Sequence, residues 1–542
     1  AGGSYASLRA SFYSRLQDVY GTPGSAATLE TTFNKFTSAM QTLASTPDSP
    51  SARSAAVGAA QVLAQQLNAM SDGIQALRSD AELGLSDSVN RANNAMQQIA
   101  NINRQLSLNN TPDAASAALL DQRDSYIDEL SQLMDIRIVS SGNNQVNVFT
   151  NSGTQLVGTE ASQLDFDAQG TMMATAQWSA DPSTRMVGTL TLVTPTGGKV
   201  DLLKSGAIRS GEIAAYVEMR DQTLVEAQAQ LDQIAAAMSS SLSDATVPGN
   251  AVASGVQNGF DVDTSGMLPG NRINLTYTDT VTGKQHRVSI VRVDDPSALP
   301  LSNEATADGG DEVIGVDFSG GLSAVAATLN AKFNGRVNVS ASGTTLRFLD
   351  DGAANNSTID AASATITRTG LTGGTELPFF MDGSTVYSGA INSAGSQSVG
   401  LAGRISVNSQ LIADPSRLVL SQPGTAAGDP TRPNFILSRL IDAPLTFSAK
   451  AGIGSASTPF TGTLSNYLRQ VISTQGENAE NASNLAAGQE VVVNALKGRV
   501  SEASAVNIDV EMANLLSLQN AYGANARVMS VVKDMLDQLM RI

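Results

Sequence analysis

Apolar side chains recur every three or four residues over long stretches at both ends of this chain of 542 residues. Such spacing places them along one side of an α-helix, which must then bury that side against another element. Near the start, the most regular run is spaced four, three, four, three, as in a coiled coil. Its members are Leu63, Leu67, Met70, Ile74 and Leu77. The pattern therefore favours a fold with long helices that pack side by side.

The last stretch of the chain, EMANLLSLQNAYGANARVMSVVKDMLDQLMRI, continues such a seam to the carboxyl terminus. Its apolar positions fit successive heptads, and a single polar residue, Asn525, occupies a seam position. A buried amide at such a position fixes the register of paired helices. The seam residues are Ile508, Leu515, Leu518, Tyr522, Asn525, Met529, Val532, Leu536 and Leu539. We expect this set to form an assembly interface.

This terminal helix needs something to pack against. It is about 50 Å long at roughly 1.5 Å per residue, and one apolar face does not hold an isolated helix together in water. The ordinary alternative is that it folds back on the core of its own chain, as most amphipathic helices do. Its length favours a rod-like partner, which is either another segment of this chain or another copy of it.

The periodicity changes along the chain in the order helix, sheet, helix, sheet, helix. This order predicts an α+β multidomain protein, in which both chain ends form an elongated helical bundle or coiled-coil body and two β-rich domains are inserted into it. The predicted parts are residues 1–135 (N-terminal helical part), 136–205 (small β domain), 206–246 (helical return segment), 247–435 (larger β-rich domain), 436–505 (C-terminal helical part) and 506–542 (terminal helix).

Within the first helical part, a new helix is predicted to begin at Thr111, which supplies an N-cap, and Pro112, which suits a first turn. The side chains expected to point inward are Leu119, Tyr126, Leu130 and Leu133. Those expected on its polar side are Asp121, Arg123, Asp124 and Asp128. The helical return segment has an apolar side of Ile213, Tyr216, Val217, Leu224, Leu231, Ile234 and Met238.

Alternating patterns predict the strands. Residues 136–153 indicate a strand, a Gly-Asn loop and a second strand, and strand signals continue to about residue 203. In the larger β-rich part, one hairpin is predicted to turn at Thr282 and Gly283, and another at Ser342 and Gly343. The lone tryptophan, Trp178, lies in a strand region and is expected in the core.

Composition limits the classes of function. The 50 acidic residues outnumber the 33 basic ones, and the net charge of −17 disfavours binding to nucleic acid or anionic lipid. Cysteine is absent, which excludes disulfides and thiolate metal sites. No apolar run reaches the roughly 18 to 20 residues that cross a bilayer. We therefore expect neither a nucleic-acid partner nor membrane insertion.

The residue patterns typical of enzymes and of metal sites are incomplete in this chain. The single histidine, His286, lies in a predicted strand, where an exposed surface residue is far more common than a catalytic base. The segment DFDAQG, from Asp165 to Gly170, begins like a calcium loop, but the position that should carry a glutamate is Ala176. The acidic loops at 308–312 and 350–351 are interpreted as solvated turns. We expect no enzyme, no cofactor and no metal.

The terminal segment resembles the C-terminal helix of flagellar axial proteins, the family of rod, hook and hook-associated proteins. The residues that carry this resemblance are Asp509, Glu511, Met512, Gln519, Ala521, Tyr522, Ala524, Asn525, Ala526 and Arg527. Three further stretches are similar to the hook-associated type 1 branch of this family. They are LLDQRDSYIDELSQLMDIRI, EMRDQTLVEAQAQLDQIAAAM and SVNSQLIADPSRLVL, the last of which matches a late strand segment.

The resemblance implies a structural subunit that joins hook to filament and assembles helically around the export channel through its terminal helices. It implies that the protein is exported by the flagellar type III apparatus and is located in the extracellular flagellum. The implied partners are copies of itself, the hook protein, the second junction protein and an export chaperone. It also implies an N-terminal helix that pairs with the terminal one. Because the chain begins with Ala1 instead of methionine, we expect an upstream segment to have been removed.

Two other hypotheses belong to different classes. One is a secreted, adhesin-like protein whose β domains recognise a surface glycan or a host protein, with the helices as a stalk. Glycan binding by residues 247–435 would favour it. The other is a secreted hydrolase, which rests only on His286 and the acidic loops.

Overall fold

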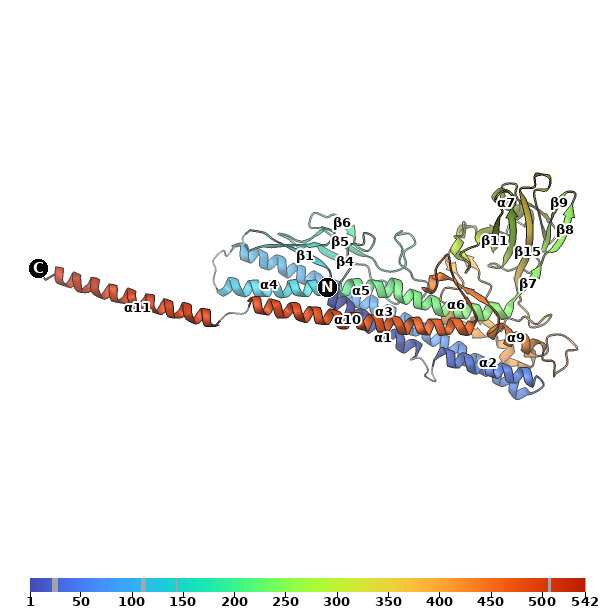
Figure 1. The fold of residues 1–542 in the computed structure, drawn as a ribbon, viewed down its shortest axis with the longest axis horizontal. Helices are drawn as coiled ribbons and strands as arrows, with labels where there is room; N and C mark the ends of the chain where they lie inside the picture. The colour runs from blue at the N-terminus through green and yellow to red at the C-terminus, as the bar shows by residue number, and fades with distance from the viewer. Residues whose placement is uncertain (22–27, 109–113, 143, 505–507, 542) are drawn as a thin grey trace. The chain divides into compact units, whose positions relative to one another are not determined.

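The computed structural model describes residues 1–21, 28–108, 114–142, 144–504 and 508–541. It combines long helices with several small sheets, so the mixed helix and sheet class predicted from the sequence is confirmed (Figure 1). The chain divides into two compact units, Ala1–Ser483 and Asn484–Ile542. The predicted helix start at Thr111 and Pro112 lies outside the described residues.

The first unit contains several helices, most of which pack against one long helix. They are α1 (Gly2–Tyr20), α2 (Leu29–Ser45), α3 (Pro50–Leu108), α4 (Ala114–Leu133), α5 (Glu212–Glu218), α6 (Leu224–Ser243), α9 (Thr431–Ile441) and the beginning of α10 (Leu464–Ser504). The whole early seam from Leu63 to Leu77 lies on α3 and is buried, which confirms that prediction. A π-helical turn, Met219–Thr223, joins α5 to α6. The sequence pattern did not predict this turn.

Two antiparallel three-stranded sheets follow α4. The first comprises β1 (Ile136–Ser140), β2 (Val146–Thr150) and β3 (Gln155–Val157), and the second β4 (Gln163–Phe166), β5 (Leu190–Val193) and β6 (Lys199–Asp201). The hairpin predicted within residues 136–153 is confirmed, since Ile136 pairs with Thr150. These sheets share a hydrophobic core with the second half of α3 and with α4, whereas the first half of α3 packs against α2 and α6 in a separate core.

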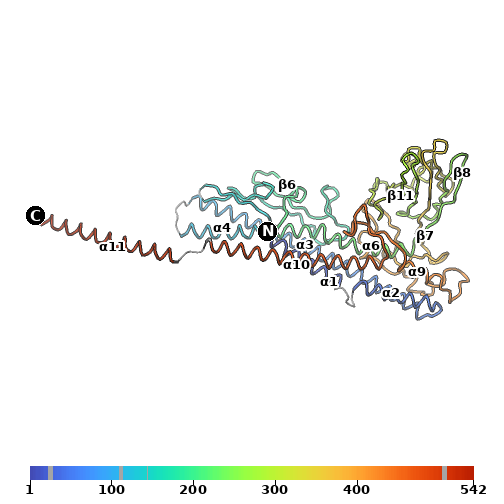
Figure 2. The backbone as a smooth tube through the Cα atoms, viewed as in Figure 1, coloured from blue at the N-terminus to red at the C-terminus, as the bar shows by residue number. Residues whose placement is uncertain are grey.

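The chain passes from α6 into the larger β-rich part at β7 (Figure 2). One sheet has the order β12-β11-β10-β15-β7, with strands β7 (Asp244–Pro248), β10 (Arg272–Asp279), β11 (Lys284–Val293), β12 (Glu312–Asp317) and β15 (Ser357–Thr367). The other has the order β13-β14-β9-β8, with strands β8 (Asn250–Ser254), β9 (Gln257–Asp263), β13 (Asn338–Ser342) and β14 (Thr345–Leu349). Both sheets and α7 (Leu322–Phe333) enclose one core.

Both hairpins predicted in this part are confirmed. Strand β10 pairs with β11 so that Ile273 lies opposite Ile290. Strand β13 pairs with β14 across a turn in which Gly343 has a φ of 59°. The helix α7 was not predicted, although Val325, Leu329 and Phe333 have helical spacing and are buried.

Short elements complete the first unit. The strands are β16 (Phe380–Asp382), β17 (Thr385–Val386), β18 (Ile391–Asn392), β19 (Gly395–Ser396), β20 (Ile405–Val407), β21 (Leu445–Phe447) and β22 (Phe460–Gly462). The helical pieces are α8 (Ser409–Ala413) and the 3-10 turns Pro296–Ala298, Asn303–Ala305, Gly352–Ala354, Leu401–Gly403, Pro415–Leu418 and Ala449–Ala451.

The late strand segment expected in SVNSQLIADPSRLVL is largely wrong. Only its first two residues belong to β20, and α8 and a 3-10 turn follow. The reason is local capping, because Asn408 accepts a hydrogen bond from the backbone N–H of Gln410 and Asp414 accepts one from Ser416. Side chains that bond neighbouring backbone groups in this way start helical turns.

The second unit contains the end of α10 and the terminal helix α11 (Ile508–Leu539). Two acidic residues, Asp509 and Glu511, lie in the first turn of α11. Negative charge at this end of a helix interacts favourably with the helix dipole. The whole of the predicted seam, from Ile508 to Leu539, lies on this one helix.

Candidate assembly interface

All the predicted interface residues lie on α11. The side chain of Ile508 lies outside the described ones, and the other members of the set are exposed in the second unit. Leu518 is 71% exposed and Tyr522 is 79% exposed, which is unusual for large apolar side chains on a regular helix. Among the described side chains of residues 484–541, none is buried. This unit thus presents apolar surface without a core of its own.

A second apolar stripe runs along α11 beside the predicted seam. Ala524, Val528, Val531 and Met535 are spaced four, three, four, and the three large ones are between 54% and 60% exposed. At about 100° per residue, this stripe lies roughly a third of a turn away from the seam of Met529 and Val532. The sequence analysis missed it, although the same spacing rule identifies it. The helix therefore offers two apolar faces, with Ser530, Asp534 and Asp537 on its polar side.

The end of α10 carries a further stripe that the sequence analysis did not name. Leu485, Val492 and Leu496 are 41%, 50% and 54% exposed. Their spacing of seven and four residues places them on one side of the helix. Apolar patches of this extent on a soluble protein mark sites of protein association.

Charged residues replace apolar ones at the point where the two cores of the first unit meet. Ala81 belongs to the first core and Leu85 to the second, and between them Glu82 accepts a hydrogen bond from Arg220 at 2.5 Å. Arg220 is fully buried and also binds Asp221 at 2.7 Å through two nitrogen atoms. We call Arg78, Glu82, Arg220 and Asp221 the ionic layer.

The ionic layer connects three elements of the first unit. The Arg78 guanidinium donates to the carbonyl oxygens of Arg220 at 3.1 Å and Met173 at 2.9 Å, while Glu82 accepts from the N–H of Gln169 at 2.9 Å. Burial lowers the pKa of Arg78 to about 10 and raises that of Asp221. Because the four charges compensate one another, the layer ties α3 to the π-helical turn and to the loop after β4.

Two expectations about charged residues are wrong. Arg123 was placed on the polar side of its helix, but it is 8% exposed and donates to the carbonyl oxygen of Asn144 at 2.5 Å. The acidic loops were interpreted as solvated, but Arg287 pairs with Asp308 at 2.8 Å and buried Asp350 accepts from the N–H of Gly352 at 2.9 Å. In both places, the partner is a group that the helix or loop pattern alone does not identify.

The other candidate residues for chemistry have structural contacts. The ring of His286 stacks on Tyr277 at 4.9 Å. In the segment that resembles a calcium loop, Asp167 accepts a hydrogen bond from the N–H of Thr189. In the part of the chain that the structure describes, no cluster of three or more His, Asp or Glu side chains is arranged to hold a metal ion. Trp178 was expected in a strand region and in the core, but it lies in the loop between β4 and β5 and is only half-buried, where it packs on a small cluster of Met172, Ala176 and Val187.

Among the helices described, none has the length and apolar character needed to span a membrane.

Two family models match separate parts of the chain. The model for the helical domain of flagellar hook-associated protein FlgK matches residues 13–257, and the model for the C-terminal part of the flagellar basal body rod proteins FlgEFG matches residues 497–542. The first match covers α3 and the ionic layer, and the second covers the whole of α11.

Curated relatives align with part of the chain. Flagellar hook-associated protein 1 of Escherichia coli (strain K12) is 28% identical over 216 residues, which are 39% of this chain and 37% of the relative. The protein of the same name from Salmonella typhimurium is 27% identical over 214 residues, which are 39% of this chain and 36% of that protein. The chain thus spans about a third of the length of these relatives.

One solved structure is that of the flagellar hook junction protein FlgK from Burkholderia pseudomallei. It is 16% identical in sequence and has a TM-score of 0.45, and the match covers 93% of this chain and 98% of that chain.

The curated relatives and the family model over residues 13–257 confirm the resemblance recognised in the sequence. The chain is thus similar to flagellar hook-associated protein 1 in its helical part and to flagellar rod proteins at residues 497–542, and these relatives are structural proteins of the flagellum.

Proposed function

We propose that this protein is the subunit that joins the flagellar hook to the filament, and that it assembles helically around an export channel through its terminal helices. The observation that carries the proposal is the second unit, in which exposed apolar stripes run along both helices. Burial of such stripes against neighbouring subunits supplies the stabilisation that an isolated helix lacks. The match of residues 497–542 to a rod protein model supports the same role.

The proposed interface is the predicted seam on α11, from Ile508 to Leu539. Heptad spacing needs a partner helix whose side chains interlock with the seam. Asn525, the polar member of the seam, would fix the register of that pairing. In this arrangement the terminal helices lie near the channel, and the β-rich parts at 136–205 and 247–435 face outward as inserted domains.

The proposed partners are copies of the same chain, the hook protein on one side and the second junction protein on the other. An export chaperone would bind the protein before secretion. The proposed location is the extracellular flagellum, reached through the flagellar type III apparatus. These assignments rest on the similarity to flagellar proteins and on the apolar surface of the second unit.

The test places a charge in the seam. Cells that lack this protein would receive variants with Leu518→Glu or Val532→Glu, and a matched control with Ser530→Glu on the polar side of the same helix. We expect both seam variants to abolish motility, because buried carboxylates oppose helix pairing. Hooks should still form, and filament subunits should appear unpolymerised in the medium.

Cells that express the Ser530→Glu control should swim normally, because the added carboxylate remains exposed to water. Normal motility of both seam variants would contradict the proposal. A secreted level equal to that of the wild type, measured by immunoblot of the medium, distinguishes failed assembly from failed export.

A further inference from the structure

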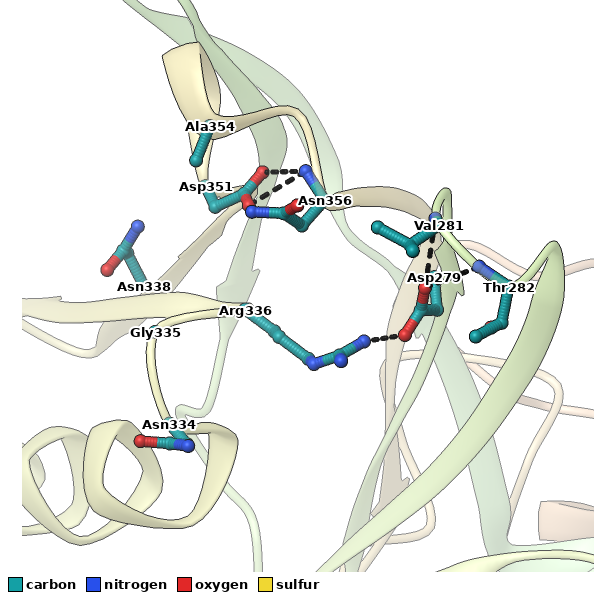
Figure 3. A pocket seen from close by; sticks show the side chains of 10 residues that line it. All are labelled: Asp279, Val281, Thr282, Asn334, Gly335, Arg336, Asn338, Asp351, Ala354 and Asn356. Atoms are coloured by element: carbon teal, nitrogen blue, oxygen red, sulfur yellow. Dashed lines mark hydrogen bonds and ion pairs between the residues drawn. The ribbon is translucent and has the colours of Figure 1, made fainter.

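The larger β-rich part contains a polar pocket that assembly through the terminal helices does not explain. It has a volume of about 460 Å³. Three loops line it: the β10–β11 turn with Asp279, the loop after α7 with Arg336, and the β14–β15 loop with Asp351 (Figure 3). Loops that gather on a rigid β scaffold are common sites of recognition.

The β10–β11 turn is held in place before any ligand binds. Asp279 is only 3% exposed, and its carboxylate accepts hydrogen bonds from the N–H groups of Val281 at 3.0 Å and Thr282 at 2.9 Å. The same carboxylate forms an ion pair with Arg336, which extends toward it from the loop after α7 (Figure 3). Two of the three loops are thus tied together.

The other loops are also fixed. Asp351 accepts a hydrogen bond from the N–H of Asn356 at 2.9 Å, and the hydroxyl of Ser357 donates to the carbonyl oxygen of Arg336. Asn334 ends α7 in the left-handed conformation with a φ of 49°. A pocket whose walls are already ordered loses little entropy when it binds a small molecule.

Several polar groups that line the pocket remain available. Asn334 is exposed and its amide has no side-chain hydrogen bond among the described residues, whereas the amide of Asn356 donates to the Asp351 carboxylate. Asn338 uses its Nδ2 on the carbonyl oxygen of Asp350 at 3.1 Å, which leaves its own amide oxygen as an acceptor. Each amide offers both donor and acceptor capacity. The pocket therefore suits a ligand whose groups can both donate and accept.

The charges narrow the class of ligand. Arg336 is paired with Asp279, and Asp351 adds a negative charge, so an anion such as phosphate is disfavoured. The described residues provide no cluster of three acidic or histidine side chains for a cation. An apolar ligand would leave the amide of Asn334 unpaired. Val281, which is 72% exposed, supplies one apolar edge.

We propose that this pocket binds a neutral carbohydrate. Adjacent hydroxyl groups of a sugar donate and accept together, which matches the amide of Asn334 and the amide oxygen of Asn338. The carbon–hydrogen face of the ring would lie against Val281. This activity is separate from the proposed assembly and does not depend on it.

The test uses the full chain and a panel of glucose, galactose, mannose and N-acetylglucosamine, measured by saturation-transfer NMR and titration calorimetry. The informative variant is Asn334→Gly, because glycine accepts the φ of 49° and only the amide is removed. The matched control is Asn355→Gly, which has a φ of 51° and does not line the pocket. We expect at least one sugar to bind, and Asn334→Gly to weaken it by about three- to tenfold.

Asn355→Gly should bind that sugar as the wild type does. Absence of binding to every sugar in the panel would overturn the proposal, as would an equal loss in both variants. Binding of inorganic phosphate or calcium ions alone in the same titration would assign the pocket to another class of ligand. Unchanged thermal transitions of both variants exclude unfolding as the cause, and unchanged motility separates this result from the assembly proposal.

Discussion

At the scale of single residues, one buried aspartate, Asp232, and one half-buried aspartate, Asp244, make the stability of the fold depend on pH. Asp232 accepts hydrogen bonds from the N–H groups of Gly400 at 2.7 Å and Ala402 at 2.9 Å, and Asp244 accepts one from the hydroxyl of Thr367 at 2.7 Å. Burial raises the pKa of both carboxyls from 3.8 to about 6. For Asp244, the nearby Arg272 and Arg439 oppose the shift without cancelling it.

A raised pKa means that the folded protein holds these protons more tightly than the unfolded chain does. Their contribution to stability is complete below about pH 4 and is lost as the pH rises through about 6. We therefore expect Asp244→Asn, which mimics the protonated form, to stabilise the protein at pH 7 by about 1–3 kcal/mol. Urea unfolding at pH 4 and pH 7 measures this difference.

The effect of Asp244→Asn should vanish at pH 4, where the wild-type carboxyl is already protonated. Equal stabilisation at both pH values would show that the charge is not the cause. Asp232→Asn is the less suitable variant, because both carboxylate oxygens of Asp232 accept backbone N–H groups and an amide nitrogen cannot replace one of them.

Residue patterns predicted the apolar seams well and the buried charges poorly. Leu63 and Ile74 are buried because helical spacing alone decides which face of α3 packs. Arg220 is fully buried as well, but its partner Glu82 is 138 residues away in the sequence. Local spacing does not reveal a pair so distant in sequence. The helical pattern therefore predicts that each of these two charged side chains is exposed to solvent.

At the scale of elements, the ionic layer holds α3 against the π-helical turn. Replacing Glu82 by Gln leaves the buried Arg220 with one acidic partner fewer, and we expect a loss of about 3–5 kcal/mol in the free energy of unfolding. The matched control on the same helix is Asp80→Asn, which breaks an ion pair with Arg15 whose side chains are 46% and 48% exposed.

We expect the control to lose less than about 1 kcal/mol, because exposed ion pairs contribute little. Chemical denaturation of both variants at pH 7 provides the comparison. Similar losses in the two variants would mean that burial of the layer does not matter for stability. The π-helical turn itself was not predictable, because the residues Met219–Thr223 continue an ordinary helical pattern.

Capping and helix length explain the elements that the sequence analysis missed. The helix α7 is short and lies among glycine-rich loops, but the spacing of Val325, Leu329 and Phe333 was sufficient to find it. Helix α8 depends on the cap at Asn408, a residue equally common in turns. Such short helices depend on the surrounding tertiary structure, so their sequence pattern alone is weak.

At the scale of the whole molecule, the mixed class of the fold followed from the alternation of helical and strand patterns. The pairing of its strands did not, because β11 and β12 run parallel and β7 pairs with β15, more than a hundred residues later in the sequence. Likewise, one seam on the terminal helix was predicted, but its second stripe was not. The spacing of Val528, Val531 and Met535 was sufficient to find that stripe, and the exposure of these side chains shows that it widens the apolar surface of α11.

The two apolar stripes of α11 together lead to a prediction about how many partner helices cover it in the proposed assembly. If one partner helix covers α11, only the predicted seam is buried, and a charge in the second stripe remains in water. If two partner helices cover it, the second stripe is buried as well. Because its large residues are as exposed as those of the seam, we expect two partners. Val531→Glu should then block assembly as completely as Leu518→Glu.

The readout is the amount of this protein retained on hook–basal bodies isolated from cells that express each variant. We expect Val531→Glu and Leu518→Glu to reduce it at least tenfold, because each places a carboxylate in a desolvated contact. The polar-side control Ser530→Glu should leave it unchanged. Retention of Val531→Glu at the wild-type level, with Leu518→Glu lost, would show that a single helix covers α11 and that the second stripe faces solvent in the assembled flagellum.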